Sequence, residues 1–94
     1  MKLALDQRMR PHPDVVDTDL DDGETALLHL ETRTYFSLNA TGSRIWRGLK
    51  AGLSLAEVSR RLEQEFQIDA EGARRSVLRV ASELADAKLA QPVE

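Results

Sequence analysis

The fold of this chain is decided by the stretch Thr34-Tyr35-Phe36-Ser37-Leu38-Asn39-Ala40-Thr41-Gly42, which continues to Ile45-Trp46. It reads as an aromatic β-strand that runs straight into a helix, because Asn39 is a residue type that caps helix N-termini. Alternation along the strand places Phe36 and Leu38 on one face and Tyr35 and Ser37 on the other. We expect Phe36 and Leu38 to pack against helices and Tyr35 to be partly exposed.

The strand at residues 34–38 has no residue that protects a sheet edge, since it contains no Pro, Lys or Glu. Natural sheets usually protect an exposed edge with charge, proline or a bulge. Such a strand is therefore either covered by its own protein or open to the strand of a partner. A role as an ordinary core strand explains the apolar face, but it does not explain the unprotected edge.

Two further strands precede this one and predict a meander. Residues 15–20 and 25–30 read as strands, and Asp21-Asp22-Gly23 between them reads as a hairpin turn. Short links between three strands favour an antiparallel sheet with the strand at 34–38 on one edge. Residues 1–14 are expected to form an extended lead-in, because the prolines of Pro11-His12-Pro13 do not fit inside a helix or a central strand.

Three helices are expected after the sheet, each with its own start signal. Asn39 caps the first helix, Ser54 and Glu57 form a capping box for the second, and Asp69 caps the third, which ends near Lys88. The fold class is therefore α+β, a three-stranded antiparallel sheet followed by three helices that cover one sheet face.

Composition sets limits on function. The chain has 94 residues, no cysteine and a formal charge of −3, which indicates one small domain without a large enclosed active site. The charge is uneven, because residues 1–31 contain eight acidic and three basic residues. An acidic domain is not expected to bind nucleic acid generally. The absence of cysteine suits the cytoplasm, and no segment is long enough to span a membrane.

No pattern in the sequence predicts a catalytic, metal or cofactor site. There is no glycine-rich phosphate loop, no Ser/His/Asp set and no cluster with metal-ligand spacing. His12 and His29 stand alone and are assigned ordinary structural or solvated roles. Asp17, Asp19 and Asp21 alternate along one strand, but they lack the spacing of a calcium loop, so protection of the sheet edge is the favoured interpretation.

A cluster of arginines on the third helix allows two interpretations. Arg74, Arg75 and Arg79, together with Leu78 and Ser82, flank the apolar face of this helix. A run of charge on a helix is most often a solvated face. If the third helix lies beside the strand at 34–38, the same arginines border a groove suited to an acidic or amphipathic peptide.

The chain resembles the PqqD family, named after the coenzyme PQQ synthesis protein D. The residues that carry the resemblance are Leu27-Leu28-His29-Leu30-Glu31-Thr32, the stretch quoted first, Ser54-Leu55-Ala56-Glu57-Val58 and Glu83-Leu84-Ala85-Asp86-Ala87-Lys88-Leu89. The resemblance covers residues 15–90. Within the family, the chain is similar to the group that includes stand-alone recognition elements of lasso-peptide pathways. The resemblance leaves residues 1–14 as a lead-in and 91–94 as a loose tail.

The resemblance implies a fold and a function. The fold is a winged helix-turn-helix, and the function is binding of the leader segment of a ribosomally made precursor peptide, without catalysis or cofactor. The maturation enzyme would be a separate partner, either a leader peptidase with a cyclase or a radical-SAM enzyme. A monomer is expected, although a dimer is possible. The implied peptide-binding residues are Thr34, Tyr35, Phe36, Ser37, Leu38, Arg74, Arg75, Leu78, Arg79 and Ser82.

Two alternatives remain open at this point. A winged-helix DNA-binding protein would use the third helix for recognition, and its arginines are compatible with that role. However, Glu71, Glu83 and Asp86 lie on the same helix. A subunit adaptor would pair its open strand with a second copy and form a symmetric dimer.

Overall fold

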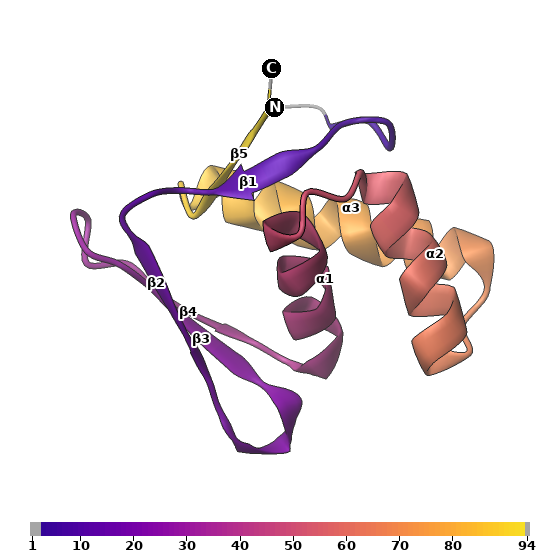
Figure 1. The fold of residues 1–94 in the computed structure, drawn as a ribbon, viewed down its shortest axis with the longest axis horizontal. Helices are drawn as coiled ribbons and strands as arrows, with labels where there is room; N and C mark the ends of the chain where they lie inside the picture. Colours follow the sequence, from indigo (N-terminus) through magenta and orange to yellow (C-terminus); the bar gives the residue numbers. More distant parts are fainter. Residues whose placement is uncertain (1–2, 94) are drawn as a thin grey trace.

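The computed structural model describes residues 3–93 and contains two small antiparallel sheets and three helices (Figure 1). In chain order, the elements are β1 (Met9–Pro11), β2 (Val15–Asp19), the 3-10 turn η1 (Asp21–Gly23), β3 (Thr25–His29), β4 (Tyr35–Leu38), α1 (Ala40–Lys50), α2 (Leu55–Phe66), α3 (Ala70–Asp86) and β5 (Ala90–Pro92). The three central strands and three helices confirm the α+β fold predicted from the sequence.

The three-stranded sheet has the order β2-β3-β4, with β4 at one edge. Its register pairs Leu27 with Phe36 and Thr25 with Leu38. Leu38 is 4% exposed and Phe36 packs against the core, whereas Tyr35 is 64% exposed. The predicted alternation along this strand is confirmed, because one face of the sheet lies against the helices and the other faces solvent.

Local capping interactions start each helix where the sequence predicts it. The side chain of Asn39 accepts a hydrogen bond from the amide of Gly42, and Asp69 does the same for Gly72, both at 2.8 Å. Ser54 and Glu57 form a reciprocal capping box. Hydrogen bonds from the backbone amide and then the side chain of Ser54, with smaller contributions from nearby arginines, lower the pKa of Glu57. The capping box is therefore formed by an ionised carboxylate.

The close approach of α1 to α2 depends on Gly48. A Cβ atom at this position would lie 2.7 Å from Cγ2 of Val58, a residue that is 2% exposed. We expect Gly48→Ala to lower the free energy of unfolding by about 1–3 kcal/mol, because the steric cost in a packed core exceeds the better helix propensity of alanine. Urea unfolding measures this change.

A suppressor variant is the control for this prediction. Val58→Ala removes the methyl group that alanine at position 48 would contact. The double variant should therefore lose less stability than the sum of the two single variants. Strict additivity would contradict the proposed contact.

A strand near the start of the chain pairs with a strand near its end, which the sequence did not predict. β1 is antiparallel to β5, with Met9 opposite Pro92 and Pro11 opposite Ala90 (Figure 1). The expectation of a loose tail is wrong for residues 91 and 92, and Glu94 lies outside the described residues. Within the lead-in, β1 pairs with β5 and joins neither edge of the three-stranded sheet. Met9 is 1% exposed, so the burial of its side chain in the core holds the β1–β5 ribbon, the pair formed by these two strands, against the domain.

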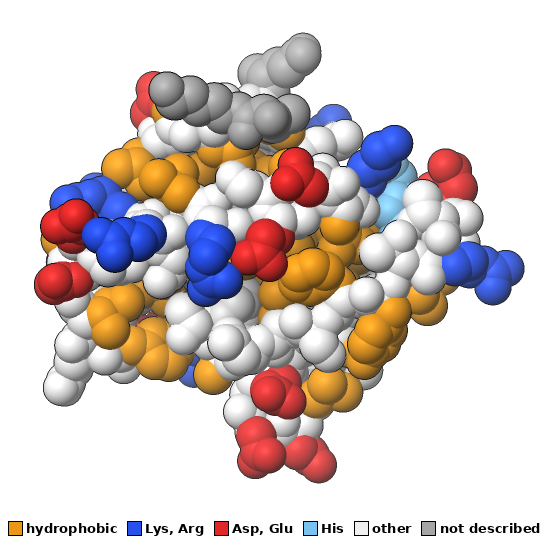
Figure 2. Space-filling view, turned by 180° about the vertical axis from the view of Figure 1, so that it is seen from behind, with side chains coloured by type: hydrophobic (Ala, Val, Ile, Leu, Met, Phe, Trp, Pro, Cys, Tyr) orange, Lys and Arg blue, Asp and Glu red, His pale blue; other side chains and the backbone are white. Residues whose placement is uncertain are grey.

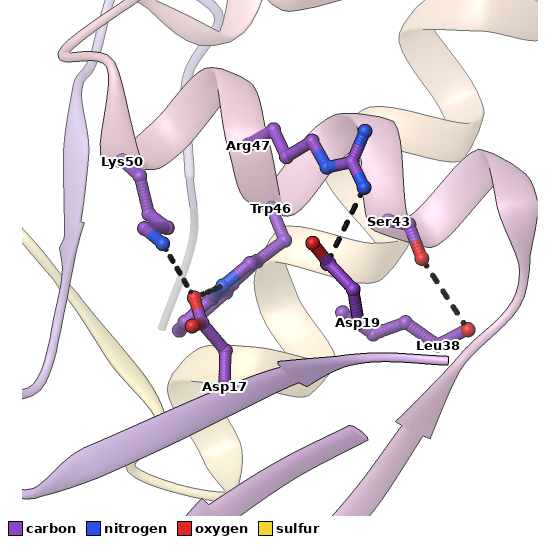
Figure 3. Close-up of polar contacts among 7 residues, drawn as sticks. All are labelled: Asp17, Asp19, Leu38, Ser43, Trp46, Arg47 and Lys50. Atoms are coloured by element: carbon purple, nitrogen blue, oxygen red, sulfur yellow. Dashed lines mark hydrogen bonds and ion pairs between the residues drawn. The ribbon is translucent and has the colours of Figure 1, made fainter. Parts of the chain in front are cut away.

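The acidic strand β2 is bound to α1 by its side chains (Figure 3). Asp17 accepts hydrogen bonds from Nε1 of Trp46 and from Nζ of Lys50, both at 2.7 Å. Asp19 lies 3.3 Å from the guanidinium of Arg47. These acids, which the sequence predicts to protect the sheet edge, also hold α1 against the sheet.

Candidate functional site

The hydrogen-bonding pattern of the sheet shows which groups of β4 face outward. The amide of His29 donates to the carbonyl of Thr34 at 2.9 Å, so odd-numbered residues of β3 bond toward β4. In an antiparallel ladder, residues that bond to the neighbour alternate with residues that do not. With Leu27 opposite Phe36, the amide and carbonyl of Phe36 point to β3. Those of Tyr35 and Ser37 therefore point away from the sheet.

No segment within residues 3–93 pairs with this outward edge of β4. The β1–β5 ribbon, the segment that could have covered it, forms a separate sheet. The unprotected edge predicted from the sequence is thus unpaired in the described chain. Free amide and carbonyl groups in a row are a template for one more strand.

A groove lies beside this edge, between β4 and α3. It contains a cavity of about 90 Å³ lined by Phe36, Ser37, Leu38, Asn39, Gly42, Arg79, Val80 and Glu83. Figure 2 shows the face of the molecule opposite to that of Figure 1, on which charged side chains lie beside exposed hydrophobic ones. A strand that adds to β4 would therefore place its inward side chains against α3.

The groove contains some of the residues expected from the sequence. Phe36, Ser37, Leu38 and Arg79 line it together. Thr34 and Tyr35 belong to the same edge without lining the cavity, whereas Leu78 packs on the core instead. The other expected residues on α3 that do not line it are Arg74, Arg75 and Ser82.

Four residues of the groove were missed by sequence reasoning: Asn39, Gly42, Val80 and Glu83. The sequence indicated Asn39 only as a helix cap, and Gly42 only as part of the stretch that resembles the PqqD family. Val80 and Glu83 lie next to Arg79 and one turn beyond it, so the helical period could have suggested them.

Two arginines of α3, Arg75 and Arg79, form weak, exposed ion pairs. Arg79 lies 3.1 Å from Glu83, and Arg75 lies 3.1 Å from Glu71. Exposed pairs of this kind contribute on the order of 0.3–0.5 kcal/mol each on a helix. A ligand carboxylate can therefore compete for the Arg79 guanidinium at small cost.

The outer face of the sheet is apolar and uncovered. Val16, Leu28 and Tyr35 are neighbours across the three strands and are 46%, 37% and 64% exposed. They are accompanied at the strand ends by Leu20 and Leu30, also exposed. A strand added at β4 would extend this face by one more row of side chains.

The described part of the chain offers no site for metal chemistry. No group of three or more His, Asp or Glu side chains within residues 3–93 could hold a metal ion. None of its helices is long and apolar enough to cross a membrane. The edge of β4 and the groove beside α3 have the geometry of a surface that binds an extended peptide. Together they define a small α+β domain with an unpaired strand edge beside a groove on a helix.

This class of domain has a matching family. The family described as "Coenzyme PQQ synthesis protein D (PqqD)" matches residues 24–90, which is more than half of the chain. The chain belongs to the PqqD family. No curated protein matches it.

Two solved structures are similar to this chain over almost their whole length. The first, "TbiB1 in Complex with the TbiA(beta) Leader Peptide", is 36% identical with a TM-score of 0.80, covering 86% of this chain and 93% of the other. The second, "Lasso peptide synthetase B1 complexed with the leader peptide", is 27% identical with a TM-score of 0.81, covering 90% and 99%. Both similar proteins therefore hold leader peptides.

Proposed function

We propose that this domain binds the leader segment of a ribosomally synthesised precursor peptide and presents the precursor to a separate maturation enzyme. The observation that carries the proposal is the unpaired edge of β4, where Tyr35 and Ser37 turn their backbone groups outward beside the groove. The leader would add as a strand at this edge. The two similar structures, each in complex with a leader peptide, support it.

The domain would contribute binding and no chemistry of its own. Tethering a precursor raises its concentration at the enzyme to the millimolar range for short flexible links, which speeds processing without a catalytic group on this chain. The enzyme would be a leader peptidase acting with a cyclase, or a radical-SAM enzyme. The domain would act in the cytoplasm, where precursor peptides are made.

Main-chain pairing would supply much of the affinity, and the groove would supply selectivity. Backbone bonds to Tyr35 and Ser37 would be largely independent of the leader sequence. Phe36 and Leu38 would contact the inward side chains of the leader, and Arg79 would attract an acidic residue. The remaining expected residues of α3 would lie beside the groove without lining it; these are Arg74, Arg75, Leu78 and Ser82.

Charge reversal at the groove should weaken leader binding. We expect Arg79→Glu to reduce the affinity for an acidic leader by about 5- to 30-fold, because a partly desolvated charge pair is lost and repulsion replaces it. Isothermal titration calorimetry measures the change. Arg75→Glu is the matched control, since Arg75 is exposed on the same helix but does not line the groove. Equal losses in the two variants would contradict the assignment of Arg79 to the site.

The proposed function itself is tested by titration with a synthetic leader. The peptide is the leader of a short precursor sought in the reading frames beside this gene, and backbone amide shifts are followed by NMR. Perturbations should concentrate at residues 34–38 and along α3. Shifts confined to other surfaces would overturn the proposal. Duplex DNA at low salt serves as the second titrant, and binding that weakens steeply with salt would favour a winged-helix DNA-binding role instead.

A further inference from the structure

The two isolated histidines of the sequence meet in a second cavity. Their ring centroids lie 4.5 Å apart, although His12 precedes β2 and His29 is the last residue of β3. The cavity has a volume of about 310 Å³, and β5 closes one side of it. We call it the histidine pocket; its other walls are formed by His12, His29, Glu31, Thr32, Ala85 and Lys88.

The histidine pocket lies where the groove ends. The groove residues Arg79 and Glu83 of α3 are followed by Ala85 near the end of this helix and by Lys88 just beyond it, both in the pocket. On the opposite wall, the chain leads from Leu38 in the groove back to Thr32 in the pocket. Histidine surface is visible on the same face as the groove (Figure 2). A peptide paired with β4 would therefore reach this pocket with the first residues beyond its paired strand.

Hydrogen bonds indicate which nitrogen of each neutral ring carries the proton. Nδ1 of His12 accepts from the amide of Asp14 at 3.0 Å. Nδ1 of His29 accepts from the amides of Glu31 and Thr32 at 3.2 and 3.3 Å. A ring nitrogen that accepts carries no proton, so each neutral imidazole keeps its proton on Nε2 and can donate there.

The Nε2 donor of His29 has no hydrogen-bond partner in the described chain, and it is not fully buried, so it can be reached from the pocket. His29 is 2% exposed, and no group within residues 3–93 forms a hydrogen bond with Nε2 of either histidine. A donor that can be reached by solvent is hydrogen-bonded to water, which the acceptor of a ligand can replace. The pocket thus presents two N–H donors to whatever enters it.

The charges around the pocket are balanced. Lys88 and Glu31 lie on different walls, and the last carbonyls of α3 add partial negative charge at its C-terminal end. A free carboxylate would meet Glu31 and these carbonyls, and a cation would meet Lys88. The remaining walls include Ala85, Ala90 and Pro92, which are apolar.

We propose that the histidine pocket binds one side chain of the captured peptide, an uncharged side chain with an apolar body and a hydrogen-bond acceptor at its tip. The side chain belongs to the first or second residue beyond the segment paired with β4. The proposal rests on the proposed function, and it adds to strand pairing a subsite that fixes the register of the peptide along β4.

Filling the pocket tests the proposal. Ala85→Leu places a larger side chain in the pocket, and Ala70→Leu makes the same change at the other end of α3 as the control. Affinities are measured for the synthetic leader described above and for a truncated leader that stops at the paired strand. Ala85→Leu should weaken binding of the full leader by about tenfold or more, and leave the truncated leader unaffected.

Removing one donor tests the chemistry. His12→Phe keeps a ring in the pocket but removes Nε2–H, and it should weaken only the full leader, by about 3- to 10-fold. In the unmodified domain, the Nε2 proton of His29 should shift in long-range nitrogen–proton spectra on binding the full leader and not the truncated one. Unchanged affinity in Ala85→Leu would overturn the subsite while leaving strand addition intact. Failure of the unmodified domain to bind either peptide would overturn the proposed function, and the subsite with it.

Discussion

Ser37→Pro should abolish strand addition while the domain stays folded. The amide of Ser37 points away from β3, so proline removes no hydrogen bond of the sheet at this position. Proline is tolerated in an edge strand when its nitrogen faces outward. The proline ring would occupy space that the incoming strand needs, and residue 37 would lose the amide that donates to that strand. We expect a loss of leader affinity of about 100-fold or more, equivalent to roughly 3 kcal/mol.

Calorimetric titration measures this loss, and Ser37→Ala is the matched control. Alanine keeps the amide and removes only an exposed hydroxyl, so its affinity should lie within about twofold of the unmodified domain. Amide spectra without peptide verify that both variants are folded. A Ser37→Pro domain that binds the leader normally would show that the groove alone carries binding.

Asp17→Ala should be among the most destabilising single substitutions outside the apolar core. Trp46 is 2% exposed, and its indole N–H donates to Asp17 at 2.7 Å. Removing the acceptor leaves this donor without a protein partner and frees Lys50 from its carboxylate. We expect a loss of about 2 kcal/mol of unfolding free energy, and a fall in melting temperature of roughly 8–16 °C for a domain of this size.

The pH dependence of stability provides a separate test of Asp17. Hydrogen bonds from Lys50 and then Trp46 hold the pKa of its carboxyl below the ordinary value of 3.8. A carboxyl whose pKa is lowered by folding stabilises the fold above its unfolded pKa, and this stabilisation is lost as the pH falls through the folded pKa. Asp17→Asn keeps an acceptor for the indole but cannot ionise. The stability of this variant should therefore decline less between pH 5 and about pH 3.

Denaturant unfolding at several pH values measures both effects. The expected order of stability at neutral pH is unmodified domain, Asp17→Asn, Asp17→Ala. An alanine variant as stable as the unmodified domain would show that the indole N–H is satisfied by water when the carboxylate is absent.

The sequence and the structure agree best where the signals are local. Asn39, Ser54 and Asp69 cap their helices within three residues of their own positions. The alternation of residues 35–38 predicted which side chains face the helices, because a strand has a period of two. The resemblance to the PqqD family was confirmed by the match over residues 24–90.

The site could be predicted only in part. The sequence identified the edge strand and α3, but it offered three arginines with equal weight, and only Arg79 lines the groove. The side chains that share a groove depend on how a helix is rotated against a strand, which packing decides. The outward position of the Ser37 amide likewise depends on the pairing of β3 with β4.

The amino-acid order alone determined the class of fold, the helix starts and the strand without edge protection, because turns, caps and periodic burial each involve residues a few positions apart. Only the tertiary structure decided the pairing of Met9 with Pro92, the bond between Asp17 and Trp46, and the meeting of His12 with His29. These contacts join distant parts of the chain. They form only because burial of one shared core brings their elements to the same place.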